Sequence, residues 1–267
     1  MDLVLSRGRS AAQACRALRF ARSTFEYVSK KLAERDLRLK ARMNELIERH
    51  KRFGSPRLHA LLKKEGLVVN HKRTERIYRE EKLQLKKRKR KRLARTLRIA
   101  RPRASRPDEV WSIDFVHDWL ILKNRKLKCL TVVDDFTKES VGIFPAHSMS
   151  GAEVTRFLAS TGRKPTRLRS DNGPEFLSTA MFKWIEETGI EHELITPGKP
   201  NENAFIESFN SRFRDECLNE HLFFDLEDAK TKIKLWQMTY NEIHPHSSLG
   251  MQSPKEFAEN WEKMLRA

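Results

Sequence analysis

Two aspartates stand where a β-strand would present or end on a carboxylate. Asp114 lies in WSIDF (residues 111–115), where apolar side chains alternate with polar ones, so a strand there directs Asp114 away from the apolar face. Asp171 follows a short β-prone segment and precedes Asn-Gly-Pro, a strong turn signal that marks a strand end. Taken alone, Asp114 also fits an ordinary exposed acid, and Asp171 an ordinary turn residue.

Glu207 lies on an expected helix with one polar and one apolar side. At about 100° per residue the polar side collects Asn203, Glu207, Asn210, Ser211 and Arg214. The opposite side collects Phe205, Ile206, Phe209, Phe213 and Cys217. The apolar side can pack on a sheet, which points Glu207 and Arg214 together towards whatever faces them. A solvated Glu-Arg face is the simpler reading of this helix taken alone.

Three carboxylates from two strands and a helix have the chemistry of a magnesium site. Mg²⁺ prefers carboxylate oxygens and keeps waters and phosphate oxygens as further ligands. A pair of such ions stabilises both the attacking and the leaving oxygen of an in-line phosphoryl displacement, so no protein nucleophile is needed. We therefore expect Asp114, Asp171 and Glu207 to hold two Mg²⁺ ions, with Mn²⁺ able to substitute.

The segments around these acids predict a mixed sheet with helices. Strands are expected over residues 110–122, 126–136, 140–146, 166–170 and 191–195. Helices are expected over 152–160 and 179–188 and around Glu207. The succession is β-β-β-α-β-α-β-α, which indicates an α/β class and fits an RNase H-like fold among other mixed sheets.

Residues 1–81 predict an all-helical region. Helices are expected over residues 10–18, 22–32, 37–50, 57–64 and 71–80, and the break at 19–21 has the spacing of a helix-turn-helix. Asn70 is placed to cap the last helix. On that helix a cationic stripe for DNA is expected from Lys72, Arg73, Arg76 and Arg79, with a solvated helix face as the alternative.

Positive charge is concentrated before the expected sheet. Of the net charge of +18, residues 1–110 carry 34 basic and 12 acidic side chains, and residues 111–267 carry 20 and 24. A basic half suits phosphate binding by counterion release, more than an anionic membrane surface or a solvated basic tail. Residues 82–107 predict an extended linker that follows DNA phosphates, most densely charged at Lys86, Lys87, Arg88, Lys89 and Arg90.

Other classes of protein are disfavoured. The apolar runs are too short to span a bilayer and the N-terminus has no apolar signal segment, so no membrane partner is expected. Cys15, Cys129 and Cys217 form no Cys-x-x-Cys pair, which argues against a structural zinc site and a disulfide framework. A reducing cytoplasm fits these separated cysteines.

Together these motifs resemble the DDE transposases of bacterial insertion sequences, whose catalytic core is shared with retroviral integrases. Thirty-five residues separate Asp171 from Glu207, which matches that family's most specific spacing, and Arg214 matches its basic residue two helical turns later. Further matching segments are WSIDF (111–115), VVDDF (132–136), RSDNGPEF (169–176), PNENAFIESFN (200–210) and YNEIHPHSSLGMQSP (240–254). HKRTERIYREEKL (71–83) is similar to the helical DNA-binding region of the second-reading-frame, or OrfB, product.

This resemblance implies an α/β fold with an RNase H-like catalytic core, a mixed five-stranded sheet flanked by helices, over residues 108–267. An all-α helix-turn-helix region over 1–81 precedes the core. The triad would be Asp114, Asp171 and Glu207, and the activity would be cleavage at element ends followed by strand transfer. Arg214 would contact DNA phosphate or steady Glu207. The implied partners are double-stranded DNA, as terminal inverted repeats and target, a second copy of the chain, and an upstream-frame OrfA protein or fusion.

Several residues depart from the family pattern or compete with the triad. Residues 137–139 (Thr-Lys-Glu) stand where Ser-Arg and a basic or polar residue are common, and His244 stands where Arg is usual. Other acids lie near the expected site in sequence: Asp118, Asp134, Asp135, Glu175 and Glu202. Asp134 matches a family position that does not bind metal, so we interpret it as structural or supporting.

Two other functions remain to be weighed against a transposase. A retroviral-type integrase would carry an N-terminal zinc module with paired histidines and a Cys-x-x-Cys, and no such cysteine pair occurs here. A domesticated or inactive transposase would keep residues 1–110 as a DNA-binding regulator. The intact triad speaks against loss of catalysis without excluding a silent copy.

Overall fold

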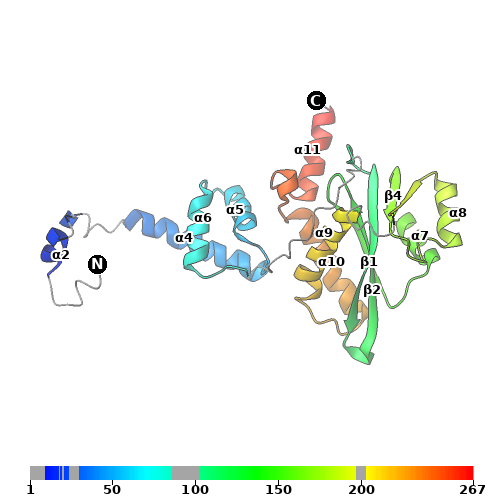
Figure 1. The fold of residues 1–267 in the computed structure, drawn as a ribbon, viewed down its shortest axis with the longest axis horizontal. Helices are drawn as coiled ribbons and strands as arrows, with labels where there is room; N and C mark the ends of the chain where they lie inside the picture. Colours follow the sequence, from blue (N-terminus) through cyan, green and yellow to red (C-terminus); the bar gives the residue numbers. More distant parts are fainter. Residues whose placement is uncertain are drawn as a thin grey trace.

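The computed structural model describes residues 10–17, 19, 21–23, 30–85, 103–196 and 203–266. Within these ranges the chain forms a helical region followed by a sheet covered by helices (Figure 1). The helical region comprises α2 (Ala11–Ala17), α4 (Lys30–Arg49), α5 (Ser55–Lys64) and α6 (His71–Glu80). The expected basic cluster at Lys86, Lys87, Arg88, Lys89 and Arg90 lies outside the described residues.

The strands and helices of the core follow one another in the predicted order. Three strands come first, and helices and strands alternate after them. Its strands are β1 (Val110–Leu120), β2 (Arg125–Asp134), β3 (Ser140–Ala146), β4 (Arg167–Ser170) and β5 (Glu191–Leu194). Its helices are α7 (Gly151–Ser160), α8 (Thr179–Thr188), α9 (Ala204–Phe213), α10 (Leu226–Glu242) and α11 (Pro254–Arg266), with a π-helical turn, η3 (Arg214–Leu218), directly after α9. Short 3₁₀ turns occur at η1 (Leu122–Asn124) and η4 (Ser247–Leu249).

The five strands form one mixed sheet in the order β3-β2-β1-β4-β5. The first three strands pair antiparallel as a meander, and β1 then pairs parallel with β4, which pairs parallel with β5. The predicted five-stranded mixed sheet is confirmed. β1 is its central strand, so residues of β1 that face a covering helix are screened from solvent on both sides.

Each face of the sheet has its own buried cluster. On one face Val116 and Cys129 pack against Ile206, Phe209 and Phe213 of α9 and against α10. On the other face a second cluster joins the sheet to α7 and α8, including Trp111, Ile113, Val154 and Met181. Figure 1 shows α9 and α10 on one side of the strands and α7 and α8 on the other. The alternation in WSIDF therefore has the predicted outcome, with Asp114 on the α9 side.

The helical region has a separate core. Leu39, Met43, Leu58, Leu62 and Ile77 are buried together between α4, α5 and α6. Helix α6 has the predicted bounds, and its predicted cap is confirmed because the Asn70 side chain accepts a hydrogen bond from the Lys72 backbone N–H.

One expected break between helices is wrong. Separate helices were expected over 22–32 and 37–50, whereas α4 runs without interruption from Lys30 to Arg49. The intervening residues Ala33, Glu34 and Arg35 are good helix formers, and no glycine or proline lies among them. With no helix breaker between them, the two expected segments join in one continuous helix.

In the described part of the chain no helix is both long enough and apolar enough to cross a bilayer. Cys15, Cys129 and Cys217 are free thiols in buried positions, and burial raises the pKa of the Cys129 thiol to about 12. The Cys129 thiol is therefore a neutral packing group at ordinary pH.

Because the core has its own buried clusters, we predict that a fragment of residues 103–267 folds without the helical region. It should show a cooperative thermal transition by circular dichroism, since its hydrophobic clusters contain no residue before 110. A fragment that starts at residue 125, and so lacks the central strand, is the matched control and should not fold. A non-cooperative transition for fragment 103–267 would contradict independent folding.

Candidate active site

Asp114 is half-buried in the middle of the central strand. Its backbone lies opposite Thr131 of β2 in the antiparallel register. Its Oδ1 accepts a hydrogen bond from the Phe115 backbone N–H at 2.7 Å, and its Oδ2 accepts one from Asn210 Nδ2 at 2.8 Å. The carboxylate is therefore directed towards α9, the helix that carries Glu207.

Asp171 is exposed immediately after the end of β4. The parallel register pairs Ser112 of β1 with Arg169 of β4, and two further residues along both strands lead to Asp114 and Asp171. The Asp171 Oδ1 accepts a hydrogen bond from the Gly173 backbone N–H at 2.9 Å, which closes the predicted turn. The end of a parallel strand thus brings this carboxylate to the level of Asp114.

Glu207 is exposed on α9, one helical turn before Asn210. Helix α9 is held on the sheet by the buried side chains of Ile206 and Phe209. The Asn210 amide joins helix to sheet twice, since it donates to Asp114 and its Oδ1 accepts a hydrogen bond from Thr131 Oγ1 at 2.9 Å. The predicted polar side of this helix is therefore the side that meets Asp114.

The charges of the three carboxylates act on one another. Burial raises the pKa of Asp114 to about 6, and the nearby negative charges of Asp171 and Glu207 also raise it. The hydrogen bonds from the Phe115 N–H and the Asn210 side chain act in the opposite direction. The structure therefore brings the three predicted acids into one electrostatic neighbourhood.

Within the described residues, no three His, Cys, Asp or Glu side chains are gathered closely enough to hold a metal ion. Asp114 is turned to Asn210, and Asp171 is turned to the backbone of its own turn. The three carboxylates therefore share one neighbourhood without converging on a single point in this structure. Glu202 lies outside the described residues.

Comparison with known proteins places the chain in a family. Integrase core domain models match residues 104–200 and 188–254, and an HTH-like domain model matches residues 34–92. An insertion element IS407 uncharacterized 31.7 kDa protein from Burkholderia multivorans (strain ATCC 17616 / 249) is 46% identical over 254 residues, which covers 93% of this chain and 90% of the relative. The chain belongs to the insertion-sequence transposases with an integrase core.

A more distant relative and a solved structure extend this picture. The transposase for insertion sequence element IS904 from Lactococcus lactis subsp. lactis (strain IL1403) is 26% identical over 246 residues, covering 86% of this chain and 96% of the relative. A chain of the simian T-cell lymphotropic virus intasome, solved in complex with PP2A regulatory subunit B56 gamma, aligns with a TM-score of 0.53 at 16% identity. That alignment covers 77% of the transposase and 74% of that chain, and it shows the fold.

Asn210 is the functional side chain whose contact the sequence analysis missed. It was assigned to the polar side of the Glu207 helix without a partner. Its position three residues after Glu207 predicts that both side chains lie on one helical face. The sequence could not predict Asp114 as its partner, because that contact depends on how α9 crosses the sheet.

A buried ionic network next to the site was also missed. The side chains of Arg169 and Asp135 are 4% and 2% exposed, and Arg169 Nη1 donates to Asp135 Oδ2 at 2.7 Å. Arg169 also pairs with Glu193 of β5, and Ser112 Oγ donates to Asp135 Oδ1. Ser112 lies two residues before Asp114, and Arg169 lies two residues before Asp171. This network therefore holds the two strands together next to the carboxylates.

Three other acids named in the sequence analysis have partners of their own. Asp134 is fully buried and accepts hydrogen bonds from the backbone N–H groups of Asp108, Phe136 and Thr137, which supports its interpretation as structural. Glu175 forms an ion pair with Lys128. Asp118 accepts a hydrogen bond from the Trp119 backbone N–H.

Arg214 is exposed, and its Nη2 donates to the His117 backbone carbonyl on β1 at 2.8 Å. The helix widens to a π-turn at this residue, so the regular spacing from Glu207 that the sequence suggested ends there. By contrast, Arg212 is turned inwards, with Nη1 3.3 Å from His246 Nδ1. The two arginines thus point in different directions.

The cationic stripe of α6 is only partly exposed. Lys72, Arg76 and Arg79 are exposed, whereas Arg73 is partly buried. Arg73 and Arg76 both pair with Asp36 of α4, at 2.7 and 2.8 Å. Helix packing therefore neutralises part of the stripe, and its role in DNA binding stays a prediction.

Lys138, in the segment that departs from the family pattern, is turned into the core. Its ammonium lies 3.5 Å from the centre of the Phe205 ring and donates to the Asp135 carbonyl. Burial lowers the pKa of Lys138 to about 8. This lysine supports the start of α9, two residues before Glu207.

If the three carboxylates share one neighbourhood, removing either partner charge will lower the pKa of Asp114. We predict that Asp171→Asn and Glu207→Gln each shift the Asp114 titration below its value of about 6, since ionisation no longer meets a neighbouring negative charge. The measurement is a ¹³C NMR titration of carboxyl groups in metal-free protein. Glu186→Gln, an exposed glutamate on α8, is the control and should leave the pKa unchanged. An unchanged Asp114 pKa in both variants would place the carboxylates too far apart to share a site.

Proposed function

We propose that this transposase cleaves the ends of its insertion sequence and joins them to target DNA with Asp114, Asp171 and Glu207 as its metal-binding triad. The observation that carries the proposal is the state of Asp114. The pKa of its half-buried carboxylate is raised by burial and by the charges of both other acids, and Asn210 ties the carboxylate to the helix of Glu207. Such perturbed acids mark functional sites more often than structural ones.

The donor set fits a hard divalent cation. All three side chains offer oxygen, the preferred ligand of Mg²⁺, and Asp171 and Glu207 are exposed to incoming ions and DNA. Two Mg²⁺ ions, with Mn²⁺ as a substitute, would neutralise the mutual repulsion of the three carboxylates. When bound, they would supply activation of the attacking oxygen and stabilisation of the leaving oxygen.

The chain's own residues have separable roles in this proposal. Asn210 orients Asp114, and the Arg169 network holds the strands that carry both aspartates. Arg214 donates a hydrogen bond to the His117 carbonyl on β1. From this position it would meet a DNA phosphate beside the triad. The attacking groups are water at the element ends and then the released 3′-hydroxyls, so the chain provides no covalent nucleophile.

Residues before 110 would bind the DNA. We propose that Lys72 and Arg79 on α6 contact phosphates, that Arg76 does so if it leaves Asp36, and that the run at 86–90 follows the backbone between the two regions. Arg73 would instead hold α6 against α4. Two element ends must be joined together, so we propose an oligomer of at least two chains, acting with an upstream-frame OrfA partner or fusion on nucleoid DNA in the cytoplasm.

We predict that Asp114→Asn, Asp171→Asn and Glu207→Gln each reduce cleavage and strand transfer by on the order of 10³-fold or more while leaving DNA affinity nearly unchanged. The amides keep the shape of the side chains and remove the charge that holds the cations. A double variant should be little worse than a single one, because one loss already disables the site. The assay uses labelled DNA with the element's own ends, Mg²⁺ or Mn²⁺, and the upstream partner.

The matched control is Asp118→Asn, which changes the same residue type on the same face of β1 and should retain cleavage. Wild-type protein that binds the ends but never cuts them would favour the DNA-binding regulator. Cleavage that persists in Glu207→Gln would mean that another acid, such as Glu202, completes the site.

A further inference from the structure

The helical region contacts the catalytic core mainly through charged side chains. The buried cluster of the helical region and those of the core share no residue, so no common hydrophobic core fuses the two parts. Arg57 of α5 pairs with Glu216, Arg52 pairs with Glu220, and Lys64 pairs with Glu256 of α11. Contacts between charged side chains orient two parts relative to each other more than they add to the affinity between them.

Glu216 is the most enclosed of these acids. Its side chain is 10% exposed, with Oε1 2.7 Å from Arg57 Nη1 and Oε2 3.1 Å from Nε2 of the buried His244. Burial would raise the pKa of Glu216, but His244 and Arg57 together lower it, so Glu216 is a carboxylate. The edge of Phe53 meets the His244 ring at 5.0 Å between centroids. His244, which stands where the family usually carries Arg, is thus a partner of Glu216.

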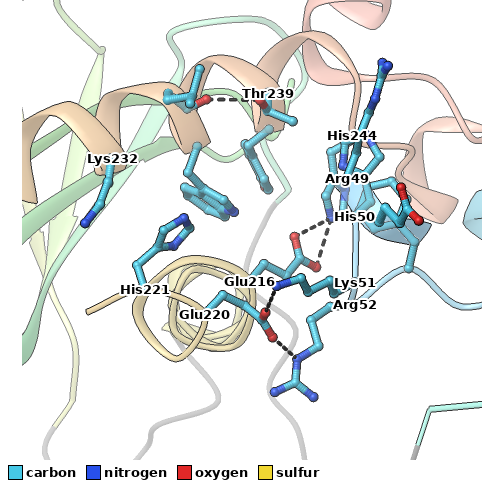
Figure 2. Close-up of a pocket in the computed structure, with 15 residues that line it drawn as sticks. Arg49, His50, Lys51, Arg52, Glu216, Glu220, His221, Lys232, Thr239 and His244 are labelled. Atoms are coloured by element: carbon cyan, nitrogen blue, oxygen red, sulfur yellow. Dashed lines mark hydrogen bonds and ion pairs between the residues drawn. The ribbon is translucent and has the colours of Figure 1, made fainter. Parts of the chain in front are cut away.

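Glu220 adds a second contact beside the first. Figure 2 shows Glu216 and Glu220 projecting from the end of one helix towards Lys51, Arg52 and His244. Glu220 lies 3.0 Å from Arg52 Nε and 3.6 Å from Lys51 Nζ. These pairs border a cavity of about 300 Å³ between the two regions. The interface is therefore not close-packed beside these ion pairs. We call the contact between residues 51–64 and the acids Glu216, Glu220 and Glu256 the joint.

The joint is attached directly to the helix of the triad. Glu216 lies in η3, which continues α9 without a break, nine residues after Glu207. A continuous helix is stiff along its axis. A contact that restrains Glu216 therefore also restrains the orientation of α9. On the other side of the joint, contacts come from residues 51–64, which leaves Lys72 and Arg79 of α6 exposed. Figure 1 shows α5 on the side of the helical region that faces the core.

We propose that Glu216 is a positioning residue, which holds the DNA-binding region in register with the Glu207 helix through Arg57. This inference rests on the proposed function, since it concerns how a bound element end reaches the triad. With the pair intact, DNA held by α6 has a fixed orientation relative to α9. Without the pair, DNA still binds, but its scissile phosphate samples a wider range of positions.

The test compares Glu216→Gln, Arg57→Gln and their double variant in the full chain. Binding to element-end DNA should stay within about twofold, whereas single-turnover cleavage at saturating DNA should fall between about 10- and 100-fold, the loss expected for a misplaced substrate. The double variant should match the single variants, because both remove the same pair. Arg57→Lys should restore most of the rate. Arg42→Gln, which breaks a pair inside the helical region, is the control and should change neither quantity.

A distance measurement separates this proposal from the proposed function. Spin labels at Glu80→Cys and Glu186→Cys, both exposed positions, report the separation of the two regions by pulsed electron resonance, and the native cysteines are buried. Glu216→Gln should broaden the distance distribution while thermal unfolding of the core is retained. A broadened distribution in a protein that never cleaves DNA would overturn the proposed function and leave the joint in place. An unchanged distribution, additive effects on cleavage, or a loss confined to DNA affinity would overturn the positioning role of Glu216.

Discussion

The hydrogen bond from Asn210 Nδ2 to Asp114 Oδ2 joins the central strand of the sheet to the helix that carries Glu207. A carboxylate in the middle of a covered strand is costly, and two further acids nearby raise that cost. Asn210 and the Phe115 N–H lower the pKa of Asp114 and so offset part of it. Ile206 and Phe209 hold the apolar face of α9 against the sheet, and this bond then fixes the orientation of Asp114 relative to the helix of Glu207.

A buried network of charged and polar side chains lies in the sheet beside Asp114 and Asp171. Arg169 and Asp135 neutralise each other in the buried layer, with Glu193 and Ser112 as additional partners. Among the described residues, the hydrogen-bond partners of Asp114 and Asp171 are an asparagine amide and backbone N–H groups, and none of them is a cation. Positive charge thus holds the strands in place, and in the proposed function the three acids beside them are the groups that would bind cations.

Local sequence patterns could predict the elements but not their contacts. Helix α6 and its Asn70 cap follow from capping chemistry, and the alternation in WSIDF correctly predicted which face carries Asp114. Pairings such as Arg73 with Asp36, or Asn210 with Asp114, join residues far apart in the chain. Such pairings depend on helix crossing angles and sheet order, which no local pattern encodes. The same reason explains why the pairing of Arg73 and Arg76 with Asp36 could not be read from the cationic pattern of α6.

The most direct test of the account is where a divalent cation binds. The transposase should be crystallised with Mn²⁺, and anomalous difference density should be measured at the manganese edge. We expect manganese between the carboxylates of Asp114 and Asp171, with Glu207 turned towards it and both aspartates released from at least one of their present hydrogen bonds. Manganese bound elsewhere, or at Asp171 without Asp114, would contradict the assignment of the triad.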